Sequence, residues 1–78
     1  MVNQLLERAI KATQLFLAFL PDVGNTVIFN LGYGRLKIWR YSGNNLWVGF
    51  IFPYKKEPAL DNLAHITIEQ YTNIALDK

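Results

Sequence analysis

The chain has 78 residues, a formal net charge of +2 and no cysteine, and 51% of its residues are hydrophobic. The lack of cysteine excludes disulfides and thiolate metal sites. One domain of this length, residues 1–78, buries only about 60% of the surface that its unfolded form exposes, so we expect self-association to add buried area.

The sequence predicts an amphipathic helix over residues 3–19, with Asn3 as its N-cap. Its second half, Leu15–Leu20, is apolar nearly all round and must be covered on more than one side. Pro21 ends the helix. This apolar run is far shorter than the ~18 residues that indicate a membrane span, and no signal peptide is evident. We therefore expect a cytoplasmic protein without a membrane partner.

Three antiparallel strands are predicted next, over Thr26–Leu31, Gly34–Tyr41 and Leu46–Pro53. Gly32-Tyr33 and Gly43-Asn44 are suited to two-residue hairpin turns, because each pair begins with glycine. The three strands therefore form a meander.

The last segment, residues 65–71, fits two interpretations. His65–Ile68 alternates like a strand, whereas Thr67 and Gln70 have the spacing of a capping box that opens a helix. We favour a helix from about Thr67 to Asp77, with a short helical turn at Pro58–Ala64. The predicted class is α+β, a single small domain with the order helix, three-stranded antiparallel meander, helix (α-β-β-β-α).

If both turns have two residues, Phe29 lies opposite Leu36 and Lys37 lies opposite Phe50. One face then forms the core with Val27, Phe29, Leu31, Leu36, Ile38, Trp47 and Ile51. The other face holds Ile28, Asn30, Arg35, Lys37, Trp39, Tyr41, Leu46, Val48, Phe50 and Phe52. That second face is too apolar for a solvated surface and needs a cover, for which the candidates are the C-terminal helix, a second copy of the chain, another protein or stacked bases. A one-residue slip in either hairpin would exchange these assignments.

The sequence shows no set of residues suited to catalysis. Ser42 is the only serine and His65 the only histidine, and a nucleophile needs a base and an orienting acid beside it. The six acidic residues and His65 show no metal-ligand spacing. We predict no enzymatic activity, no metal, no cofactor and no small-molecule substrate.

Residues 23–56 lack Asp and Glu but contain both tryptophans and five cationic residues. We interpret the protein as a small non-enzymatic protein-interaction module of regulatory, adaptor or inhibitor type. It is expected to bind another protein or a second copy through the apolar sheet face or the apolar end of the first helix. The expected contact residues are Ile28, Trp39, Tyr41, Val48, Phe50 and Phe52.

The alternative is a nucleic-acid-binding module. On one face of the middle strand, Arg35 and Lys37 can meet phosphates while Trp39 and Tyr41 stack on bases. Lys55 and Lys56 add charge where the third strand ends.

Overall fold

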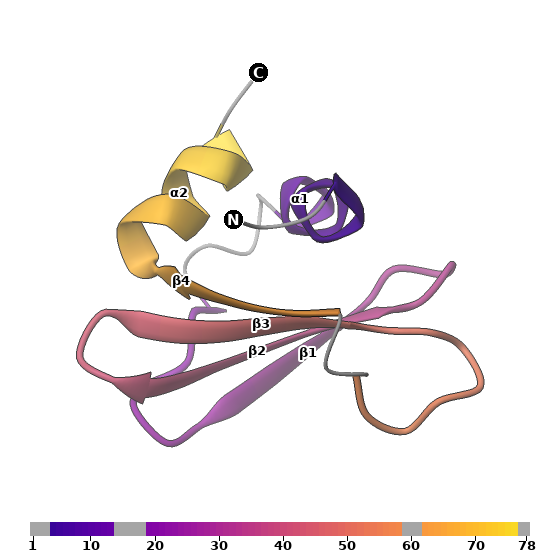
Figure 1. Cartoon of the computed structure of the whole chain (residues 1–78), viewed down its shortest axis with the longest axis horizontal. Helices are drawn as coiled ribbons and strands as arrows, with labels where there is room; N and C mark the ends of the chain where they lie inside the picture. Colours follow the sequence, from indigo (N-terminus) through magenta and orange to yellow (C-terminus); the bar gives the residue numbers. More distant parts are fainter. Residues whose placement is uncertain (1–3, 14–18, 59–61, 77–78) are drawn as a thin grey trace.

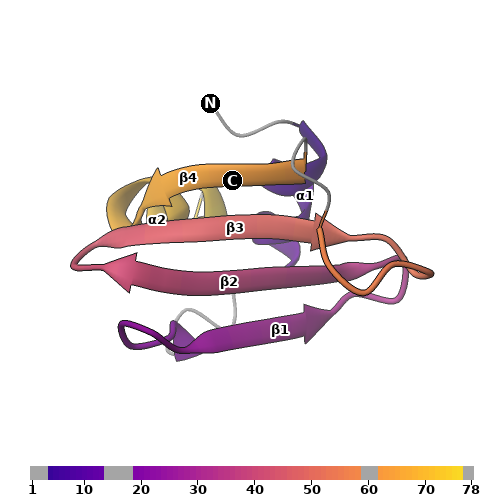
Figure 2. The ribbon, with the colours of Figure 1, turned by 60° about the horizontal axis from the view of Figure 1, so that its bottom comes forward.

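The computed structural model describes residues 4–13, 19–58 and 62–76. Two helices and a four-stranded antiparallel sheet are present, so the α+β class is confirmed, whereas the three-stranded meander was one strand short (Figure 1). The strands lie in the order β1-β2-β3-β4 (Figure 2). The elements in chain order are α1 (Gln4–Ala12), β1 (Thr26–Asn30), β2 (Arg35–Ser42), β3 (Asn45–Ile51), β4 (Leu63–Thr67) and α2 (Ile68–Leu76).

Both helices lie on the same side of the sheet, side by side (Figure 1). They pack on each other and mainly on β2, β3 and β4. No described helix lies on the other side of the sheet (Figure 1). We call that second side the open face.

The core lies between the helices and the sheet. Burial of Leu6, Ala9 and Ile10 on α1 follows the predicted apolar stripe. Tyr71 on α2 is fully buried, and its hydroxyl group lies 3.0 Å from Thr13 Oγ1, which itself donates a hydrogen bond to the Ile10 carbonyl. The buried cluster consists of Leu6, Ala9, Ile10, Leu36, Ile38, Leu46, Val48, Phe50, Ala64, Ile66, Tyr71 and Ala75.

The first hairpin has the predicted register. Phe29 lies opposite Leu36, and the Leu31 N–H donates to the Gly34 carbonyl at 2.8 Å. Gly32 has φ +84°, a value that residues with a Cβ rarely adopt, which explains why glycine stands at this turn.

The second hairpin has the predicted turn but not the predicted register. Ser42 pairs with Asn45 around the turn, but an irregularity between Arg40 and Ser42 then shifts the pairing by one residue. Trp39 lies opposite Trp47, where the sequence analysis placed Val48. An extra residue in one strand forms a β-bulge, and a shift of one residue moves every side chain of the partner strand to the other face.

Both interpretations of residues 65–71 are correct for part of the segment. The strand β4 runs to Thr67, and the helix α2 starts at the next residue. The predicted capping box is confirmed, because the Thr67 N–H donates to Gln70 Oε1 at 2.8 Å and the Gln70 N–H donates to Thr67 Oγ1 at 3.1 Å. The helical turn predicted at Pro58–Ala64 was wrong for Leu63 and Ala64, which belong to β4. Residues 59–61 of that turn lie outside the described residues.

The first helix is shorter than predicted. It ends at Ala12, and the Thr13 N–H bonds to the Ile10 carbonyl at 3.0 Å, which tightens the last turn. Asn3 and residues 14–18, which include most of the apolar end, lie outside the described residues, and Phe19 and Leu20 are in no α-helix. In the described part of the chain, no helix is long and apolar enough to cross a membrane.

Candidate binding face of the sheet

The four strands contain no aspartate or glutamate. Alternation along the strands and the observed pairing assign the open face to Thr26, Ile28, Asn30, Arg35, Lys37, Trp39, Tyr41, Asn45, Trp47, Gly49, Ile51, Leu63, His65 and Thr67. The charges on this face that come from the strands are therefore positive.

Four rings form a continuous strip across three strands, which we call the aromatic patch: Trp39, Tyr41, Trp47 and His65. The ring centroids of Trp39 and Trp47 are 6.5 Å apart with an interplanar angle of 29°. Trp47 lies 5.7 Å from Tyr41 and 5.5 Å from His65, measured between centroids. The Tyr41 hydroxyl group is also hydrogen-bonded to His65 Nε2. These contacts join β2, β3 and β4 on the uncovered side of the sheet.

Two cations precede the aromatic patch on the same face of β2: Lys37 lies next to Trp39, and Arg35 lies two residues further away. Lys37 Nζ is 4.9 Å from the centroid of the Trp39 ring, a cation–π distance, and 2.6 Å from Glu57 Oε2. Arg35 donates from its guanidinium group to the Lys55 carbonyl at 2.9 Å. Both side chains therefore also hold the loop that follows β3.

This loop, residues 52–58, which we call the exit loop, covers one end of the open face (Figure 1). A Cβ built on Gly49 would lie only 2.6 Å from Pro58 Cγ and 2.6 Å from Leu63 Cδ2. Glycine is therefore required where the loop lies against β3. Ile51, although on the open face, is 1% exposed. The exit loop leaves the aromatic patch and Ile28 as the uncovered part of the face.

The register shift overturns part of the expected contact set. Val48 and Phe50 are 0% and 1% exposed and belong to the core under the helices. Phe52 is half-buried and packs edge-on against Phe50, with ring centroids 5.1 Å apart. The bulge in β2 moved all three away from the open face.

The other predicted residues do come together on the open side. Ile28 is 51% exposed and Tyr41 39%, while Trp39 is half-buried. Arg35 and Lys37 share that face, whereas Lys55 and Lys56 are exposed in the exit loop rather than on a strand.

Sequence reasoning missed Trp47, His65 and Gly49 as parts of this face. Trp47 was assigned to the core because an unbulged second hairpin places it there. The signal that could have corrected this is the match between neighbouring strands: Leu46, Val48 and Phe50 share one face of β3 in either register, but only the shifted register places that face beside Leu36 and Ile38. Leu46, Val48 and Phe50 then all point to the helices.

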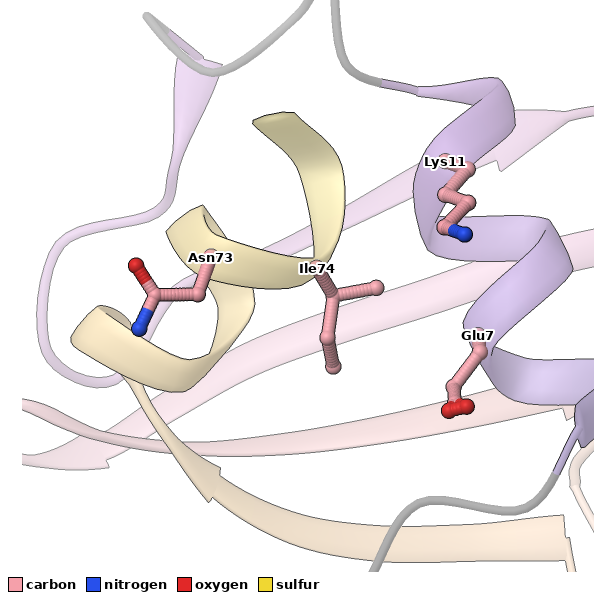
Figure 3. Close-up of a pocket in the computed structure, with 4 residues that line it drawn as sticks. All are labelled: Glu7, Lys11, Asn73 and Ile74. Atoms are coloured by element: carbon pink, nitrogen blue, oxygen red, sulfur yellow. The ribbon is translucent and has the colours of Figure 1, made fainter. Parts of the chain in front are cut away.

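One end of the open face has a hollow lined by Asn30, Gly32, Gly34, Arg35 and Pro53. Another hollow lies between the helices and is lined by Glu7, Lys11, Asn73 and Ile74 (Figure 3). In that view Ile74 points from α2 toward α1, while Glu7 and Lys11 stand one turn apart on α1. These residues include no nucleophile with a base beside it, and among the described residues no cluster of His, Asp and Glu could hold a metal ion.

Comparison of the chain with protein-family models, with curated proteins and with solved structures finds no match.

Proposed function

We propose that this protein is a non-enzymatic module that binds single-stranded nucleic acid on the open face of its sheet. The observation that carries the proposal is the aromatic patch, which lies next to Lys37 and on the same face as Arg35, in a sheet whose strands contain no acidic residue.

Stacking on bases is the first part of the argument. Sheets that bind single strands use exposed rings on neighbouring strands, and each stacked base contributes about 1–3 kcal/mol. Trp39, Trp47 and His65 lie on three consecutive strands, and the ring of Tyr41 contacts those of Trp47 and His65. A surface of this width offers room for about two or three bases.

Charge is the second part. A nucleic acid whose bases stack on Trp39 and Trp47 would place phosphates near Lys37, and Lys55 and Lys56 extend the positive surface along the exit loop. Glu57, which is paired with Lys37, is the carboxylate in contact with this surface. Binding of a phosphate would therefore compete with Glu57 for the same ammonium group.

Fluorescence anisotropy with labelled single-stranded DNA and RNA tests the proposal. We expect binding at low ionic strength that weakens as salt rises, because phosphate contacts release counterions. Tryptophan emission should be quenched on binding, since both tryptophans lie on the open face. A duplex of the same sequence should bind more weakly, because its bases are already stacked.

A matched pair of variants separates a defined site from general attraction to a positive protein. Replacing Lys55 and Lys56 by glutamine should weaken binding by about tenfold and reduce the salt dependence. Replacing Arg8 and Lys11 on α1 by glutamine removes the same charge from the far side of the sheet and should change affinity little (Figure 1). Equal losses in both variants, or no salt-dependent binding by the wild type, would contradict the proposal.

The second candidate is the protein-interaction module. Its specific support is Ile28, a large aliphatic residue that is 51% exposed on the open face at the edge of the sheet. Self-association through the centre of the sheet face has lost its main support, because Val48 and Phe50 are buried in the core and Phe52 packs against it.

A further inference from the structure

We infer that β1 pairs with β1 of a second copy of this chain, so that two sheets join edge to edge around a two-fold axis through Ile28. This inference is independent of nucleic-acid binding. It concerns the edge of the sheet rather than the aromatic patch.

The hydrogen-bond pattern shows which groups of β1 are directed outward. The Leu31 N–H donates to the Gly34 carbonyl, so this pair is a hydrogen-bonded one. Bonded pairs alternate with non-bonded pairs in an antiparallel ladder, so Phe29 and Val27 also bond to β2. The backbone N–H and C=O groups of Ile28, and of Thr26 and Asn30 on either side, are directed away from β2. In the described part of the chain, no other strand pairs with β1.

The edge lacks the features that normally prevent strand pairing. Its residues, Thr26–Asn30, include no charge, no proline and no glycine, and the pairing with β2 is regular over the whole strand. Natural sheets protect exposed edges with lysine, proline, bulges or a covering element. The bulge of this sheet lies in β2 instead, between Arg40 and Ser42.

The strand is also the least buried of the four. No residue of β1 is fully buried, whereas each of the other three strands contains fully buried residues. The helices pack mainly on β2, β3 and β4, which leaves β1 at the margin of the helix layer (Figure 1). Val27 and Phe29, which point to the helix side, are only half-buried. Added burial at this margin would enlarge a small core.

A second copy complements this edge with every residue paired. In an antiparallel arrangement centred on Ile28, that residue meets the same residue of the second copy on the open face. Thr26 meets Asn30 of the second copy, and the outward groups form about six hydrogen bonds. On the helix side Val27 meets Phe29 of the second copy in a non-bonded pair, in which side chains lie closest. Such an interface is isologous and closes as a dimer.

Sedimentation equilibrium over micromolar to millimolar concentration tests the inference without any nucleic acid. The wild type should rise from a 9.0 kDa species toward twice that mass. Ile28→Lys places two like charges face to face at the axis and should raise the dissociation constant by about tenfold or more. Tyr54→Lys, at a loop residue that is 91% exposed, adds the same charge away from the edge and should leave the dimer intact.

If Ile28→Lys fails to fold, cysteine cross-linking tests the proposed dimer instead. The chain has no cysteine, so Ile28→Cys introduces a single thiol. In the proposed dimer the Cα atoms of residue 28 in the two copies lie about 5.5 Å apart, which is within the range of a disulfide. Mild oxidation should link this variant at least tenfold faster than Tyr54→Cys. A wild type that stays monomeric, a dimer that Ile28→Lys does not weaken, or equal cross-linking rates for the two cysteines would each overturn the inference.

Discussion

Trp39 and Trp47 lie directly opposite each other on β2 and β3, with ring centroids 6.5 Å apart. An extra residue in β2 beside the second turn sets this relationship. Without the bulge, Trp47 would point into the core and Val48 would face Trp39 on the outside. The bulge therefore places Trp47 in the aromatic patch and Val48 in the core.

Trp47→Ala should remove the central ring of the aromatic patch. Because each stacked base contributes about 1–3 kcal/mol, we expect affinity for a single-stranded oligonucleotide to fall by about 5- to 150-fold. Anisotropy titration measures the loss, and circular dichroism checks that the fold is retained. Tyr33→Ala changes an aromatic residue that stacks on Phe50 beside the core and is the matched comparison. A larger loss for Tyr33→Ala would place the binding surface elsewhere.

Glu57→Gln should strengthen oligonucleotide binding. The change frees Lys37 from its ion pair and removes a negative charge beside the aromatic patch. We expect a gain of a few-fold at low ionic strength that disappears at high salt. Glu69→Gln on α2 makes the same change of charge on the helix side and should have little effect. Glu57 is 70% exposed, so loss of the ion pair should alter the free energy of unfolding by less than about 1 kcal/mol.

Gly49→Ala should destabilise the fold. The new methyl group would lie 2.6 Å from Pro58 Cγ and Leu63 Cδ2, so the exit loop or β4 must shift. Overpacking of this kind costs about 1–3 kcal/mol, measured by denaturant unfolding. Adding Pro58→Ala should restore part of that loss, because the two sites are in contact and their effects are not additive. Equal stability of wild type and Gly49→Ala would show that the loop does not hold this position.

Tyr71→Phe should cost about 1 kcal/mol, because it removes the hydrogen bond between Tyr71 and Thr13 that joins the two helices. Thr13→Val should cost more, about 1–3 kcal/mol, because it leaves the buried Tyr71 hydroxyl group without its partner. Urea unfolding of both variants measures the order. The reverse order would show that another group accepts this hydrogen bond.

The same tyrosine should make stability fall at alkaline pH. Burial raises the pKa of Tyr71 above its ordinary value of 10.0, so the folded chain keeps the phenol neutral where the unfolded chain ionises it. This contribution to stability is complete below pH 10.0 and is lost as pH rises through the folded pKa. The free energy of unfolding should fall more steeply above about pH 10 in the wild type than in Tyr71→Phe. Parallel curves would contradict this assignment.

Short sequence motifs correctly predicted both hairpin turns and the start of the second helix. Glycine at the first position of each turn located both hairpins, and the spacing of Thr67 and Gln70 located the start of α2. These features depend on a few adjacent residues, so the sequence expresses them directly.

The missed features depend on contacts between distant residues. No turn rule reports the bulge between Arg40 and Ser42, because its cause is the fit of Leu46, Val48 and Phe50 under helices that lie far from this hairpin in the sequence. The strand β4 was missed for a different reason. Its last residue, Thr67, is also the cap of α2, so the helix signal overlaps the end of the strand. Half of the expected contact residues, Ile28, Trp39 and Tyr41, stayed on the open face, and the single shift removed the others.

Because both helices lie on one side, the two faces of the sheet have different roles (Figure 1). Leu36 and Ile38 point to the helices, while Lys37 and Trp39 between them point away. Folding therefore constrains the inward residues and, on the open face, the end under the exit loop with Gly49 and Ile51, and it leaves the other outward residues free to vary during evolution. A lineage of such proteins could exchange one ligand for another by drift in the outward residues while the same inward residues preserve the architecture.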